Sequence, residues 1–92
     1  MELKDYRDQL DHIDAQIIKL FRARMETVGQ IAAYKKANHL PILAAGREQE
    51  ILDRVRAHSG ETLAPYAQEL FETLMRLSRE YQNTLLNDSD SF

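Results

Sequence analysis

Residues 3–38, LKDYRDQLDHIDAQIIKLFRARMETVGQIAAYKKAN, decide the fold of this chain. Apolar side chains recur there at steps of three and four residues, a spacing that places them on one face of an α-helix. The stretch contains no proline, and the turn Asn38-His39-Leu40-Pro41 follows it. The pattern predicts one amphipathic helix from about residue 3 to about residue 38. We call the apolar residues of its first half the N-terminal seam: Leu3, Tyr6, Leu10, Ile13, Ile17 and Leu20.

Two further helices are predicted downstream. The first is short, begins near Gly46 and stops at His58-Ser59-Gly60, where Gly60 suits a left-handed cap. The second begins near Thr62, a candidate N-cap with Pro65 in the first turn, and carries an apolar stripe to about Leu86. No run alternates well enough to predict a strand. The fold class is therefore all-α, with one domain over residues 1–86 and a polar tail or linker remnant over residues 87–92.

Composition limits what such a chain does. Its 92 residues include no cysteine, which excludes disulfide scaffolds and thiolate metal sites. The net charge of −3 argues against nucleic acid or an anionic membrane as partner. No uncharged run spans a bilayer and no secretory signal opens the chain, so we expect a cytoplasmic protein. The three histidines lack metal-ligand spacing and the glycines form no phosphate loop, so we expect neither a metal nor a cofactor.

The long helix requires a second copy of the chain. About 36 helical residues span about 54 Å, whereas a compact globule of 92 residues is about 30 Å across. Two shorter helices cannot cover an apolar face of that length, so we predict a symmetric helical homodimer with paired long helices. On pattern alone, a bundle whose only role is to associate remains equally open.

Two cations interrupt the apolar face of the long helix. Arg24 occupies a position where an aliphatic residue would pack better, and a buried guanidinium needs an anion, either from the protein or from a ligand. Lys35 lies eleven residues further on, about 20° around the helix and about 16 Å along it. Both could converge on one small anion above Val28 and Ile31. A structural salt bridge or snorkelling to solvent are the alternatives for Arg24.

Several other polar residues indicate a functional site only when they are considered together. Arg7 lies about 25 Å from Arg24 along one helix, but it would approach Arg24 of the partner in an antiparallel dimer; otherwise it is a solvated surface residue. Arg47 and Glu48 open the second helix, where an acid suits the helix dipole in any case. Ser78 and Gln82 are spaced i, i+4 in an apolar stripe, which indicates a lined cavity or a polar helix flank.

Taken in chain order, these residues resemble the all-helical chorismate mutases. The resemblance runs from about Leu3 to about Leu86. It rests on Arg7, on R-x-R-M-E at residues 22–26, on Lys35, on R-E-Q-E at residues 47–50 and on S-R-E-Y-Q at residues 78–82. It implies an intertwined homodimer with two shared active sites, each borrowing one arginine from the other chain. It also implies rearrangement of chorismate to prephenate, on the route to phenylalanine and tyrosine, without a cofactor.

The resemblance further implies a role for each residue. Arg24 and the partner's Arg7 hold the two substrate carboxylates, with Arg47 assisting and Ser78 as an additional contact. Lys35 and Gln82 bond the ether oxygen, so that Lys35, Gln82 and Arg24 are the catalytic residues. Glu48 faces the ring hydroxyl.

One position departs from the family's pattern. Ala44 stands where the family usually has an aspartate, which leaves hydroxyl recognition to Glu48. Two other functions stay open at this point: an isochorismate pyruvate-lyase of the same helical family, and a non-catalytic dimerisation or regulatory module.

Overall fold

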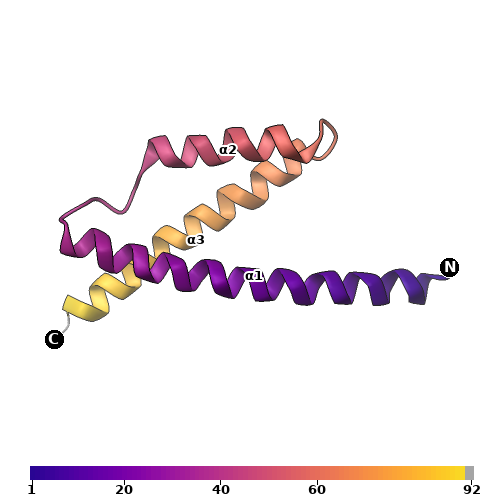
Figure 1. The fold of residues 1–92 in the computed structure, drawn as a ribbon, viewed down its shortest axis with the longest axis horizontal. Helices are drawn as coiled ribbons and strands as arrows, with labels where there is room; N and C mark the ends of the chain where they lie inside the picture. Colours follow the sequence, from indigo (N-terminus) through magenta and orange to yellow (C-terminus); the bar gives the residue numbers. More distant parts are fainter. Residues whose placement is uncertain (91–92) are drawn as a thin grey trace.

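The computed structural model describes residues 1–90, with side chains through Asn87. These residues form three α-helices and no strand: α1 (Leu3–Ala37), α2 (Ala45–Ser59) and α3 (Ala64–Asp90) (Figure 1). The prediction of an all-α chain with one long, one short and one medium helix is confirmed for this part of the chain.

Helix α1 ends in a Schellman motif, which positions the loop after it. Asn38 is the C-cap residue, and its side-chain amide donates to the Tyr34 carbonyl over 2.8 Å. His39 takes a positive φ of 55°, and the amide of Leu40 then donates to the Lys35 carbonyl over 2.8 Å. The chain therefore reverses beside Lys35, and residues 40–44 run back along the end of α1 toward α2.

Helices α2 and α3 meet at a turn over residues 60–63. Gly60 ends α2 at the predicted position, with a φ of 80° that suits glycine, but its ψ of 154° lies outside the left-handed helical conformation predicted for the cap. The prediction that Thr62 caps α3 is wrong, because α3 begins at Ala64 and Thr62 lies within the turn. The amide of Ala64 instead donates to the carbonyl of Gly60 over 2.9 Å, which carries the turn directly into the helix.

The predicted polar tail also needs correction. Helix α3 passes its expected end near Leu86 and continues to Asp90, so residues 87–90 are helical rather than frayed. No glycine or proline stops the helix there, and each added residue contributes one more backbone hydrogen bond at little cost. Residues 91–92 of the predicted tail lie outside the described residues.

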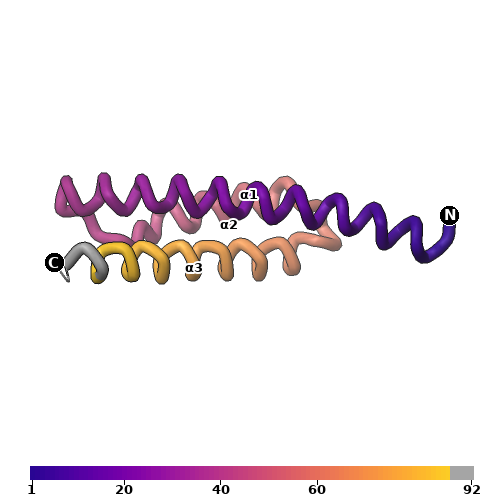
Figure 2. Tube along the Cα trace, turned by 90° about the horizontal axis from the view of Figure 1, so that it is seen from below, coloured from indigo at the N-terminus to yellow at the C-terminus, as the bar shows by residue number. Residues whose placement is uncertain are grey.

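Helix α3 is the centre of the chain, because α1 and α2 both pack against it. Figures 1 and 2 show that it lies beside the C-terminal half of α1, while the N-terminal half of α1 projects beyond the other helices. The buried residues are Val28 and Ala32 of α1 and Met75, Ser78 and Gln82 of α3. Two polar side chains in so small a core indicate a site rather than a plain packing interface.

The chain is extended for its size. Its radius of gyration is 16.7 Å, whereas about 12 Å is typical of a compact domain of this length. The residues of the N-terminal seam are 47% to 69% exposed, which confirms that the helices of one chain leave this seam uncovered. None of the helices in residues 1–90 combines the length and the apolar character that crossing a bilayer requires.

Candidate active site

A cavity of about 350 Å³, which we call the cleft, opens where the C-terminal half of α1, the start of α2 and the middle of α3 converge. Six of the seven predicted site residues line it: Arg24, Lys35, Arg47, Glu48, Ser78 and Gln82. Val28 and Ile31 of α1 and Met75 of α3 are among its apolar lining residues. Arg24 and Lys35 therefore line the same cavity as Val28 and Ile31, and their convergence on one small anion stays a prediction.

Arg24 is half-buried and is held by a neutral partner. Its Nη1 atom donates to the hydroxyl of Ser78, and that hydroxyl donates to the carbonyl of Leu74 one turn earlier in α3 over 2.7 Å. Ser78 itself is 6% exposed. The hydroxyl fixes the direction of the guanidinium without cancelling its charge.

Lys35 is positioned by the loop that the Schellman motif creates. Its Nζ atom donates to the backbone carbonyl of Ile42 over 2.7 Å. An ammonium group has three N–H donors, so this bond orients Nζ and leaves two of them for a ligand. Lys35 is half-buried as well, and its partner is again neutral.

The cleft is electropositive. Among the described residues that line it, four are basic and one is acidic: Arg24, Lys35, Arg47, Arg79 and Glu48. The ion pairs among residues 1–87, whose side chains the structure describes, include neither Arg24 nor Lys35. Arg47 is more exposed and pairs with Glu50 of the same helix over 3.3 Å. The structural salt bridge considered for Arg24 is thus absent from the described residues, and the positive charge of the cleft is available to an anion.

Gln82 contributes a buried amide to the cleft. The side chain is 5% exposed, and its Oε1 atom has no hydrogen-bond partner among the described residues. A buried amide oxygen without a partner costs free energy, and such groups occur where a ligand completes the hydrogen bonding.

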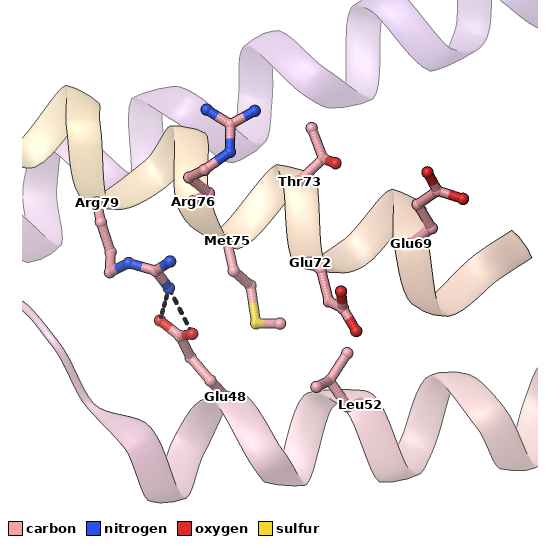
Figure 3. Close-up of a pocket in the computed structure, with 8 residues that line it drawn as sticks. All are labelled: Glu48, Leu52, Glu69, Glu72, Thr73, Met75, Arg76 and Arg79. Atoms are coloured by element: carbon pink, nitrogen blue, oxygen red, sulfur yellow. Dashed lines mark hydrogen bonds and ion pairs between the residues drawn. The ribbon is translucent and has the colours of Figure 1, made fainter. Parts of the chain in front are cut away.

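Glu48 is paired with a residue that our sequence analysis missed. Arg79 Nη1 donates to both carboxylate oxygens of Glu48, with a distance of 2.6 Å to Oε2. Figure 3 shows the two side chains pointing toward one another across the space between α2 and α3. Arg79 lies inside the S-R-E-Y-Q motif, four residues after Met75 and three before Gln82. That helical spacing to two inward-facing residues was the signal that could have identified it.

Two other predicted positions need separate statements. Arg7 is exposed on the N-terminal half of α1 and does not line the cleft of its own chain. Ala44 does line the cleft and immediately precedes α2, so the aspartate that the family usually has at this position would face the same cavity.

The fold and the cleft together define a small all-α protein with one electropositive cleft between its three helices. Residues 6–83 match the family described as chorismate mutase type II. The chain therefore belongs to the chorismate mutase type II family, which confirms the resemblance drawn from the sequence.

Two curated relatives are similar to the chain. The T-protein of Haemophilus influenzae is 34% identical over 83 residues, which cover 88% of this chain and 22% of that protein. The bifunctional chorismate mutase/prephenate dehydratase of Aquifex aeolicus is 35% identical over 54 residues, which cover 59% of this chain and 15% of that protein. The chain thus spans less than a quarter of the length of these relatives. No solved structure shows a significant match.

Proposed function

We propose that this chain is a chorismate mutase that rearranges chorismate to prephenate, the step toward phenylalanine and tyrosine. One observation carries the proposal: Arg24 and Lys35 converge on one cleft with only neutral protein partners. Chorismate carries two carboxylates on a compact frame, so it suits a small cleft with excess positive charge. Family membership and the name of the Aquifex aeolicus relative, a bifunctional chorismate mutase/prephenate dehydratase, support the same substrate.

The reaction is intramolecular. A carbon–oxygen bond breaks while a carbon–carbon bond forms within one molecule, so the protein must hold the reactive conformer and stabilise charge on the ether oxygen. Lys35 is suited to that oxygen because the Ile42 carbonyl already orients its Nζ atom. Gln82 is the second candidate, because its buried side chain lines the cleft and its amide carries two N–H donors at Nε2.

The carboxylates of chorismate are assigned to the arginines. Arg24, directed by the Ser78 hydroxyl, binds one carboxylate, with Ser78 as an additional contact and Arg47 as a further cation at the rim. Glu48 faces the ring hydroxyl, because a carboxylate accepts hydrogen bonds and that hydroxyl is the donor that chorismate offers.

The second carboxylate is assigned to the partner's Arg7 in an intertwined homodimer. Support comes from the exposed N-terminal seam, which a second chain can bury, and full burial of one aliphatic side chain stabilises by about 1.5–3 kcal/mol. In an antiparallel arrangement the partner's N-terminal half lies over the cleft, which carries the partner's Arg7 toward Arg24.

A cytoplasmic location is part of the proposal, because a chain with no cysteine suits a reducing compartment.

The test is to incubate the purified chain with chorismate and to follow the loss of its absorbance and the formation of prephenate. Isochorismate is tried in parallel, and an Arg24→Ala/Lys35→Ala double variant, purified identically, controls for contaminating enzymes. We expect turnover of chorismate by the parent chain alone. Release of pyruvate from isochorismate without turnover of chorismate would establish the lyase instead, and turnover of neither would leave a non-catalytic module.

A further inference from the structure

The ion pair between Glu48 and Arg79 differs from the other ion pairs in the described residues. It joins α2 to α3 across 31 positions of the sequence, and its side chains are only 24% and 33% exposed. The pairs Lys4–Asp8, Arg47–Glu50 and Arg76–Glu80 each lie within one helix, and their side chains are more than half exposed. Exposed pairs of that kind contribute little to stability, so the pair between helices is the one with a structural consequence.

The pair also forms part of a wall between two cavities. Glu48, Arg79 and Met75 line the cleft, and they also line a second cavity of about 400 Å³ between α2 and α3. Figure 3 draws the residues that line this second cavity, with Glu72 and Leu52 further along the same space as the pair. Without Arg79, the Glu48 side chain could turn toward either cavity, because no other described residue forms a hydrogen bond or an ion pair with its carboxylate.

The carboxylate needs such a partner for an electrostatic reason as well. Glu48 is the acidic residue among the described lining residues of a cleft proposed to bind a dianion. An unpaired carboxylate there would repel the ligand's own carboxylates. Arg79 cancels that charge, yet it occupies only one acceptor position on each oxygen, and a carboxylate has about four in total. The remaining positions stay open to a hydroxyl donor.

We propose that Arg79 is a positioning residue that acts through Glu48. It holds the carboxylate on the cleft side of the wall and neutralises it, so that Glu48 accepts a hydrogen bond from the ligand hydroxyl. The importance of this pair follows from Ala44, which lines the same cleft without offering a second carboxylate. The inference rests on the proposed function, because it presumes a dianionic ligand with one hydroxyl.

The test is a cycle of variants assayed with chorismate: Arg79→Met, Glu48→Gln and the double variant. Methionine keeps the unbranched stem of the arginine and removes the donors. Because Glu48 contacts the hydroxyl before and during the reaction, Arg79→Met should raise KM about tenfold and change kcat by less than about threefold. In the Glu48→Gln background the same substitution should change KM by less than about threefold, since the residue through which it acts is already altered.

Arg79→Lys keeps a cation and serves if Arg79→Met fails to fold. It should raise KM by a smaller factor, about threefold, and this rise should also disappear in the Glu48→Gln background. Arg76→Met is the matched control, because Arg76 lies one turn earlier on α3, lines only the second cavity and pairs with exposed Glu80. We expect its KM to equal that of the parent.

Three results would overturn the inference while the proposed function stands: an unchanged KM in the Arg79 variants, an equal rise with and without Glu48→Gln, or an equal rise in Arg76→Met. The second result would make Arg79 a direct clamp on the ligand. If the parent chain does not turn over chorismate at all, the proposed function fails first and this inference fails with it.

Discussion

Replacing Lys35 with alanine should slow the chemical step far more than it weakens binding. The Nζ atom donates to the Ile42 carbonyl over 2.7 Å and has two further N–H donors, and the side chain lines the cleft. A unit charge about 3 Å from another, at an effective dielectric constant of about 20, interacts by about 5.5 kcal/mol. If about half a charge develops on the ether oxygen, the loss is about 2.8 kcal/mol, or about 10²-fold in kcat.

The assay is steady-state turnover of chorismate by the parent, Lys35→Ala and the control Lys36→Ala. Lys36 is the neighbouring lysine on α1, is exposed and does not line the cleft, so its removal should leave kcat unchanged. Circular dichroism must show equal helix content in all three proteins. A parental kcat in a folded Lys35→Ala variant would refute the assignment of Lys35 to the ether oxygen.

Three other perturbations have definite outcomes. Ala44→Asp should lower KM for chorismate, because residue 44 lines the cleft. Aspartate and serine at this position both cap the N-terminus of α2, so the control Ala44→Ser should raise Tm as Ala44→Asp does without lowering KM. Equal KM values for the two variants would place the new carboxylate away from the hydroxyl. Gly29→Ala should stabilise the fold by about 0.5–1 kcal/mol in thermal unfolding, because the added Cβ meets Leu85 Cδ1 at an ordinary 3.7 Å; destabilisation would indicate a second backbone against Gly29 in the dimer. Ile17→Asp should raise the Kd of the dimer at least about tenfold in light scattering, while Ala15→Asp on the opposite side of α1 should not; a parent mass near the 10.7 kDa of one chain would contradict the dimer itself.

Much of the fold was predictable because its signals are local. The three- and four-residue spacing of apolar side chains placed α1, and Asn38 and Gly60 mark the ends of α1 and α2 as predicted. The predicted end of α3 near Leu86 is wrong because a polar composition was taken as a sign of fraying, although residues 87–90 contain no glycine or proline that stops a helix. The predicted start of α3 is wrong because Thr62 has a side chain suited to an N-cap but lies inside the turn before the helix.

The candidate site could be predicted from the sequence where its residues share one face of the same helix. Arg24 and Lys35 share a face of one helix, and so do Ser78 and Gln82, which spacing alone can show. The pairing of Glu48 with Arg79 joins two helices 31 positions apart, and spacing within one helix says nothing about such a contact. The proposed contact of Arg7 with the ligand requires a second chain, and spacing along one helix carries no information about how two chains pair.

The measurement that tests the central claim most directly is recovery of activity in hybrid dimers. Arg7→Ala and Arg24→Ala should each be nearly inactive as homodimers, because every site then lacks one of its two carboxylate clamps. When the two variants are unfolded together and refolded, random pairing makes about half of the dimers hybrids, and one site in each hybrid receives both arginines intact. About a quarter of all sites should then show the parental kcat, with hybrid formation confirmed by mass spectrometry. If hybrids form and no activity returns, Arg7 does not serve the cleft of the partner, and the shared active site is contradicted.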